Sequence, residues 1–195
     1  MHKLIELIPA VKRLELRNVG CWESLDIEFL PGLNIITEEG TALGKTTIFK
    51  AILHSLTPMS PLEYRPTPTI GRESGTISVE FMFRTLSVPL RSSRDALHRK
   101  EGESSGAFVF RQLKAAVQGA PPGMALLIDE QVTALLDSKH YRETMESLDC
   151  APCQVLCQIA HCFELEGFPD ARVYACHRQE RDTPGMKLRQ SGRGA

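Results

Sequence analysis

The feature that most restricts the fold of this chain is an apolar run, then a loop, then a helical segment that opens with Gly-Lys-Thr-Thr. Residues 33–38 (LNIITE) are apolar and β-branched, as in a buried strand. Gly44, Lys45 and Thr46 match the end of the P-loop pattern Gly-x-x-x-x-Gly-Lys-Ser/Thr, although Glu39 stands at its first glycine. The apolar residues that follow have a helical spacing: Ile48, Phe49, Ile52, Leu53 and Leu56. This order of strand, loop and helix indicates a nucleotide-binding α/β fold.

The Gly-Lys-Thr segment predicts a site for the phosphates of a nucleotide. Backbone N–H groups at the start of the helix would face the phosphates, with the helix dipole behind them. Lys45 is expected to reach the β- and γ-phosphates and Thr46 to bind Mg²⁺, while Gly40 provides the turn. The alternative is an ordinary helix that happens to open with Gly-Lys-Thr. The residues of this segment expected to contact nucleotide are Gly40, Thr41, Gly44, Lys45, Thr46 and Thr47.

A second segment, MALLIDE, places two acids directly after an apolar run. Residues 125–128 are expected to form a central strand with Asp129 and Glu130 at its carboxyl end, where ligands bind in open α/β sheets. Asp129 can hold Mg²⁺, directly or through water. Glu130 is then placed to orient or deprotonate a water molecule that attacks a γ-phosphate. The alternative is a strand that merely ends in acids, which is common for such runs taken singly.

Composition sets the class of protein. The chain has 195 residues, 42% of them hydrophobic, and a net charge of −1, which suits one domain at residues 1–177 with a proper core. Residues 178–195 are basic and lack periodicity, and we expect them to be a disordered tail. The near-zero charge argues against a protein that coats nucleic acid by charge alone. Without a long apolar run or a signal-peptide pattern, a cytoplasmic protein with no membrane contact is expected.

A cluster of cysteines raises the question of a metal site. Cys150, Cys153, Cys157 and Cys162 lie close in sequence, beside His161, and a Cys-x-x-Cys pair invites a zinc interpretation. Most of the cluster, however, has the composition of a buried strand, in which cysteines are small hydrophobic residues that alternate between faces. We favour the buried strand.

Alternating and helical patterns predict the remaining elements. The stretch 57–75 is rich in Pro, Ser and Thr and is expected to be loop, and 92–106 is polar. The pattern predicts strands at 11–18, 24–29, 33–38, 76–83, 86–91, 123–130, 154–160 and 171–176, and helices at 107–120 and 138–148.

Five marks in order, over roughly residues 11–177, resemble the ATP-binding-cassette ATPases, and within them the branch of RecF and the structural-maintenance-of-chromosomes proteins. The opening from Leu14 to Thr47 is similar to that branch, with two strands and a Pro/Gly turn before the phosphate loop. The other marks are the acids of MALLIDE, a signature-like segment at Ser104, Ser105 and Gly106, a D-loop-like segment at Thr133 to Asp137, and a switch-like histidine, His161.

The resemblance implies a P-loop NTPase fold of the ABC-head type, with a mainly parallel central sheet and an N-terminal antiparallel β subdomain. It implies ATP and Mg²⁺ as cofactors and Glu130 and His161 as catalytic residues. It also implies a head-to-tail homodimer, in which the signature serine and glycine of one subunit close over the γ-phosphate held by the other. The branch places Trp22 near the adenine, where its ring can stack on the base. Trp22 can equally be a core or rim aromatic, and His161 a strand-end histidine.

Departures from the family pattern bear on turnover. Glu39 and Ala42 replace loop glycines, and no glutamine lies between Thr47 and Gln112, so the family's Q-loop residue is missing. An ATP binder with weak or partner-dependent hydrolysis is therefore compatible with the sequence.

Three functions remain open at this point. The first is a minimal ATPase that serves a DNA repair, mobile-element or defence complex, with a partner protein subunit supplying specificity and DNA contacted indirectly. The second is the nucleotide-binding domain of a transporter, and the third is a nucleotide-binding scaffold without turnover. Residues 47–106 read as loops and a hairpin rather than a helical lobe, which favours the first over the second. A small-molecule P-loop kinase is weaker, because it would not explain the signature-like and D-loop-like segments.

Overall fold

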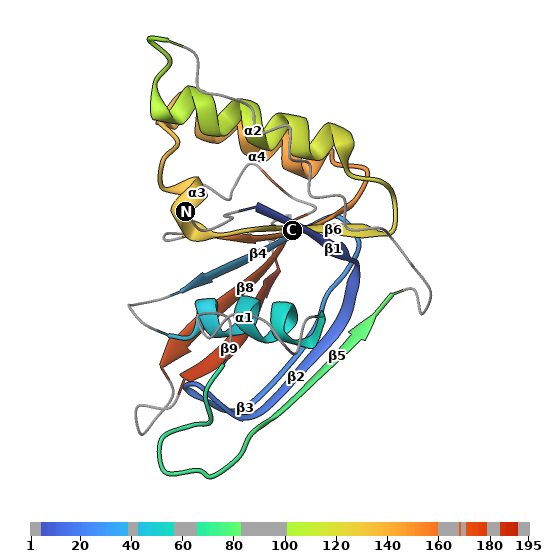
Figure 1. Ribbon diagram of the computed structural model, residues 1–195, viewed down its shortest axis with the longest axis vertical. Helices are drawn as coiled ribbons and strands as arrows, with labels where there is room; N and C mark the ends of the chain where they lie inside the picture. Colours follow the sequence, from blue (N-terminus) through green and yellow to red (C-terminus); the bar gives the residue numbers. More distant parts are fainter. Residues whose placement is uncertain are drawn as a thin grey trace.

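The computed structural model describes residues 5–38, 43–56, 66–82, 101–159, 168, 171–178 and 184–190. Within these ranges the chain forms two β-sheets and four helices (Figure 1). The sequence predictions that fall on Gly40, Thr41, His161, Cys162 and the strand at 86–91 lie outside the described residues.

The larger sheet has six strands in the order β1-β6-β7-β4-β8-β9. Its four inner strands run parallel and its two outer strands run antiparallel to their neighbours. Every residue of β6 and β7 is buried, as expected for parallel strands covered on both faces. This confirms the predicted α/β fold with a mainly parallel central sheet. The strands are β1 (Ile5–Pro9), β4 (Leu33–Glu38), β6 (Met124–Ile128), β7 (Gln154–Gln158), β8 (Arg172–Arg178) and β9 (Pro184–Gln190).

The two outer strands were not foreseen. The sequence pattern predicts no strand at residues 5–9, where the structure has β1, and it predicts a disordered tail at residues 178–195, where the structure has β9. The second expectation is wrong for residues 184–190, which pair along their whole length with β8. A strand that adds to a sheet edge gains its stability from backbone hydrogen bonds to a neighbour. Such pairing leaves little trace in the periodicity of the strand's own sequence.

The smaller sheet is antiparallel, with the order β3-β2-β5, and it confirms the predicted antiparallel subdomain. Its strands are β2 (Val11–Val19), β3 (Trp22–Glu28) and β5 (Thr76–Phe81). In β2 and β3, buried apolar residues such as Leu14, Leu16, Leu25 and Ile27 alternate with exposed polar ones. The apolar face therefore points inward, toward α1.

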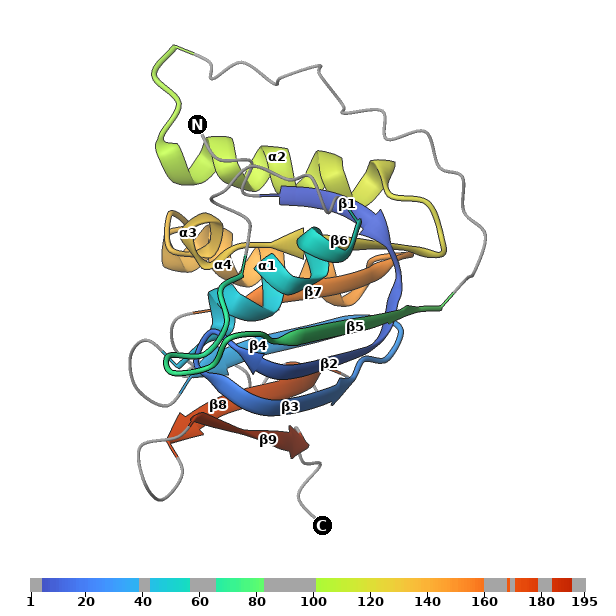
Figure 2. The ribbon, with the colours of Figure 1, turned by 60° about the horizontal axis from the view of Figure 1, so that its bottom comes forward.

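Helix α1 (Lys45–Leu56) lies between the two sheets (Figures 1 and 2). Its buried Ile48, Phe49 and Ile52 join residues of both sheets in one apolar core. Helices α2 (Ser105–Gly119) and α4 (Ser138–Asp149) cover the opposite face of the large sheet around a second core. The short α3 (Glu130–Thr133) follows β6 directly. None of the helices in the described ranges is long and apolar enough to cross a membrane.

Candidate functional site

The predicted motifs meet at one edge of the large sheet. Strands β4, β6 and β7 are parallel, so their carboxyl ends lie at the same edge, where ligands bind in open α/β sheets. Figure 1 shows the start of α1, the start of α3 and the start of α2 on this side of the molecule. The three segments that the sequence analysis singled out are thus brought to one side by the topology.

Lys45 lies at the centre of this edge and is only 4% exposed. Its Nζ donates a hydrogen bond to the backbone oxygen of Ile159 at 3.0 Å. It also forms ion pairs with Glu130 Oε2 at 2.7 Å and with Glu38 Oε1 at 3.2 Å. A buried ammonium is stable only when it is paired in this way, because burial removes its hydration. The chain therefore holds a fixed positive charge at the first turn of α1.

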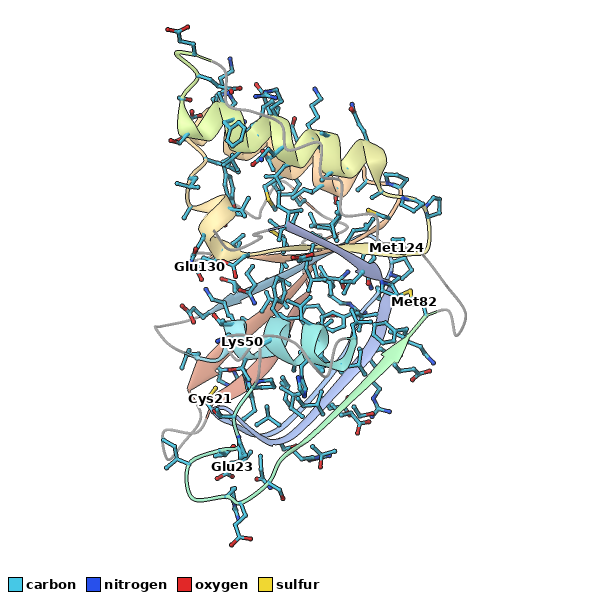
Figure 3. The ribbon with its side chains drawn as sticks, in the orientation of Figure 1. Cys21, Glu23, Lys50, Met82, Met124 and Glu130 are labelled. Carbon is cyan, nitrogen blue, oxygen red and sulfur yellow. The ribbon has the colours of Figure 1, made fainter. Side chains whose placement is uncertain are left out.

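An open pocket of about 430 Å³ faces this lysine. Five of its lining residues were predicted as site residues: Gly44, Lys45, Thr46, Thr47 and Glu130. Two were missed, Glu38 and Cys21. Figure 3 shows Glu130 and Cys21 on opposite sides of the start of α1. Burial raises the pKa of the Cys21 thiol, so at neutral pH this side chain adds no negative charge to the pocket.

The residue that precedes Lys45 packs tightly against the turn between β2 and β3. Gly44 has a φ of +94°, and a Cβ at this position would lie 2.4 Å from Cys21 Sγ and 2.5 Å from Trp22 Nε1. The indole N–H of Trp22 donates to the Gly44 oxygen at 3.2 Å. Glycine is therefore required here for two separate reasons, the backbone conformation and the lack of space.

Trp22 does not have the position that the resemblance implied. It is fully buried in the core between the sheets, so neither face of its ring is open to a base. The alternative interpretation, a core aromatic, is correct. The strict alternation of β3 does not reveal this, because Trp22 is buried three residues before Leu25 and is separated from it by the exposed Glu23 and Ser24. The Trp22 indole packs against Gly44 and binds its backbone oxygen.

Gly44→Ala is expected to destabilise the fold by about 2–5 kcal/mol, the sum of a left-handed backbone and an overpacked contact. Gly71→Ala is a matched control, because Gly71 has a similar φ of +82° but no atom within 4 Å of the added methyl group. The control should lose only about 1–2 kcal/mol. Urea denaturation followed by the fluorescence of the single tryptophan measures both. Equal losses would show that the contact with Cys21 and Trp22 is not tight.

Hydrogen bonds at the end of β7 connect Lys45 to α3, the short helix that follows β6. Gln158 is buried, and its Nε2 donates to the Lys45 backbone oxygen at 2.7 Å. The hydroxyl of Thr133 in α3 is within donor distance of two backbone oxygens, that of Glu130 at 3.0 Å and that of Gln158 at 3.2 Å. The sequence analysis did not single out Gln158, although glutamines at both ends of a fully apolar segment, as in QVLCQ, are a signal of satisfied buried amides.

Asp129 and Glu130 have different environments. Asp129 caps α3, with Oδ1 accepting a hydrogen bond from the Gln131 N–H at 2.9 Å, and it does not line the pocket. Glu130 lines the pocket and is held by Lys45. The structure thus joins Glu130 to the phosphate loop, whereas the role of Asp129 as a Mg²⁺ ligand stays a prediction.

The signature-like and D-loop-like segments form a second cluster at the same edge. Ser104 caps α2 by accepting a hydrogen bond from the Ala107 N–H at 3.1 Å, and Ser105 is exposed. Gly106 is buried, and a Cβ added there would lie 3.1 Å from the Leu135 oxygen and 3.3 Å from Asp137 Oδ2. Asp137 caps α4 and pairs with His140 at 2.7 Å. Hydrogen bonds from His140, first from its backbone N–H and then from its ring, lower the pKa of the Asp137 carboxyl.

These four residues do not line the Lys45 pocket of their own chain. The structure therefore separates the predicted nucleotide contacts into two groups. The phosphate-loop group lines the pocket. The second group, Ser104, Ser105, Gly106 and Asp137, lies at the starts of α2 and α4, where Gly106 approaches Asp137.

The residues of the pocket fit a nucleotide phosphate with Mg²⁺. The buried ammonium of Lys45 is a fixed positive charge of the kind that binds phosphate oxygens. Thr46 is exposed in the pocket, and its hydroxyl is a hard oxygen donor of the kind that Mg²⁺ accepts. The N–H groups of Lys45 and Thr46 have no acceptor within the helix and are suited to an anion, whereas the N–H of Thr47 donates to the Gly44 oxygen at 3.1 Å.

A zinc site finds no support in the part of the chain that is described. No group of three or more His, Cys, Asp or Glu side chains converges there. Cys153 and Cys157 are buried among apolar residues of the second core. Burial raises the pKa of Cys157 to about 12, in keeping with a small apolar side chain in the core.

A parallel sheet whose inner strand β4 leads into Gly-Lys-Thr at the start of a buried helix defines a P-loop nucleoside-triphosphatase fold. A family profile described as an AAA domain matches residues 13–111, slightly more than half of the chain. The chain belongs to this family of P-loop ATPases, which are found in RecF-like and SMC-like proteins. A comparison with curated proteins finds no match. The family match includes Lys45 and Ser104–Gly106 and ends before Glu130.

Proposed function

We propose that the chain is an ATP-binding and ATP-hydrolysing subunit of the RecF and SMC branch. The observation that carries the proposal is the buried Lys45 at the start of α1, which faces an open pocket and contacts the acid that follows β6. Membership of the AAA domain family supports ATP as the nucleotide. An ordinary helix does not need a buried lysine beside an open pocket at its first turn, whereas a phosphate-binding helix does.

The described side chains have distinct tasks in this proposal. Lys45 supplies positive charge to the β- and γ-phosphates, and the first turn of α1 supplies N–H donors. Glu130 leaves Lys45 when phosphate arrives and then orients or deprotonates the attacking water. Mg²⁺, with Thr46 and Asp129 as its expected ligands, neutralises phosphate charge when it is bound. His161 stays a predicted catalytic residue outside the described ranges.

The second cluster supports the proposal of a head-to-tail homodimer. Ser104 and Ser105 are exposed at the start of α2, on the same side of the molecule as Lys45 but outside its pocket. Leu135, whose oxygen lies next to Gly106, is a large apolar residue that is 47% exposed. We infer that these groups meet the nucleotide of a second copy, so that ATP joins the two subunits.

The assembly is testable with Glu130→Gln, which should form a dimer with ATP and Mg²⁺ but not with ADP, because only ATP has the bridging phosphate. Adding Ser105→Arg should return the protein to monomer while nucleotide binding is retained. Ser104→Arg should do the same, but it also removes the cap of α2 at a cost of about 1 kcal/mol. Light scattering at tens of micromolar protein measures the assembly.

Ser78→Arg is the matched control for this experiment, since Ser78 is an exposed serine on β5, far from α2 in the fold. It should leave the ATP-dependent dimer intact. A single mutant that stays monomeric with ATP, or that dimerises equally with ADP, would overturn the head-to-tail assembly. Nucleotide binding measured on the same samples keeps that result separate from the nucleotide site.

We further propose that the subunit serves a DNA repair, mobile-element or defence complex through a partner protein. The support for this finer assignment is the resemblance of residues 11–177 to the RecF and SMC branch. A scaffold with little hydrolysis is the second candidate, and one observation favours it: Glu130, the expected base, is paired with Lys45 at 2.7 Å. The transporter assignment has no comparable support.

A further inference from the structure

Glu38, the last residue of β4, is a charged pocket residue for which the proposed function has no task. Its Oε1 pairs with Lys45 Nζ at 3.2 Å, and its Oε2 accepts a hydrogen bond from the Leu43 N–H at 3.3 Å. One carboxylate thus contacts both the lysine and a backbone donor of the phosphate loop. These two kinds of group are the ones that a P-loop offers to phosphate oxygens.

The position of Glu38 is fixed more firmly than that of the other acid in the pocket. Glu38 is part of a central strand and pairs in register with Cys176 of β8, and its side chain is 14% exposed. Glu130 begins a four-residue helix, and its side chain is 35% exposed. Burial, and after it the charge of Glu38, raises the pKa of Cys176 to about 12. Glu38 is therefore the more deeply buried of the two acids that contact the lysine.

We propose that Glu38 is an internal anion that occupies the phosphate-binding groups of the loop in the absence of nucleotide and lowers the affinity for nucleotide. The inference rests on the proposed nucleotide site. An incoming phosphate must take Lys45 and the Leu43 N–H from this carboxylate and then remain next to its negative charge. The phosphate and the carboxylate repel each other, so nucleotide binding should depend more strongly on a cation that binds together with the nucleotide.

Glu38→Gln removes the charge and keeps the size of the side chain. The variant should bind ADP and ATP about tenfold more tightly than the wild type, the effect expected from the loss of one competing ion pair. The loss of affinity on removal of Mg²⁺ with a chelator should also be smaller than in the wild type. Glu23→Gln is the matched control, because Glu23 is exposed and lies outside the pocket (Figure 3). It should bind nucleotide like the wild type.

Calorimetric titration of the three proteins with ADP and with ATP, each with and without Mg²⁺, decides the question. Equal or weaker binding by a folded Glu38→Gln variant would overturn the inference and leave the nucleotide site standing. Absence of binding in the wild type and both variants would overturn the proposed function itself. If Glu38→Gln does not fold, as judged by circular dichroism, Glu38→Asp replaces it. The shorter carboxylate should withdraw from Lys45 and tighten binding about threefold, and unchanged binding would overturn the inference.

Discussion

Replacing Lys45 with alanine is expected to abolish tight ATP binding. Lys45 is the motif side chain that brings fixed positive charge to the phosphates, and it is held in place by the Ile159 oxygen and two carboxylates. Truncating one partner of a buried, hydrogen-bonded charge pair costs about 2–5 kcal/mol or more, which is a loss of affinity of about 30- to 4,000-fold. Equilibrium dialysis with labelled ATP and Mg²⁺ measures the loss.

Lys50→Ala is the control for this variant, because Lys50 lies on the same helix and does not line the pocket. It should bind ATP like the wild type. Lys45→Ala also leaves the Glu38 and Glu130 carboxylates without their shared cation, so the folded state of the variant must be checked by thermal melting. A folded Lys45→Ala protein with the affinity of the wild type would refute the assignment of the phosphate loop.

Glu130→Gln is expected to have the second large effect, a loss of ATP hydrolysis with retained ATP binding. The amide keeps the shape and hydrogen-bonding capacity of the carboxylate but cannot accept a proton from water. General-base catalysis contributes about 10²–10⁴-fold, so turnover should fall within that range. Release of inorganic phosphate under saturating ATP measures turnover, and dialysis measures binding.

Glu143→Gln is a suitable control, since Glu143 is an exposed acid on α4 outside the pocket. Its turnover should equal that of the wild type. Unchanged turnover in Glu130→Gln would remove this residue from the catalytic role. If the wild type itself shows no measurable hydrolysis while it binds ATP, the scaffold function becomes the better account.

Local patterns in the sequence were sufficient for the main parts of the fold and the site. The run at residues 33–38, the helical spacing after Lys45 and the acids after Ile128 each depend on neighbours in the chain, and the structure has the corresponding β4, α1, β6 and α3 start. The parallel sheet then brings Lys45 and Glu130 together, as the order of the motifs predicts.

The features that the sequence did not reveal depend on partners far away in the chain. The place of Gln158 in the site depends on its hydrogen bond to the Lys45 backbone, and that of Trp22 on its hydrogen bond to the Gly44 backbone. Strands β1 and β9 are defined by the neighbours to which they add. Glu38 had a local signal, because a carboxylate directly before a phosphate loop is an unfavourable neighbour for a nucleotide. The sequence does not show that the two Glu38 oxygens contact Lys45 and the Leu43 N–H, because these contacts form only when the chain folds.

The claim that most of this account depends on is that ATP binds at the pocket of Lys45. Calorimetric titration of the wild-type chain with ATP in the presence of Mg²⁺ tests it most directly. The account predicts saturable binding of one ATP per chain, and competition by ADP for the same site. No saturable binding of either nucleotide by the folded protein would contradict it.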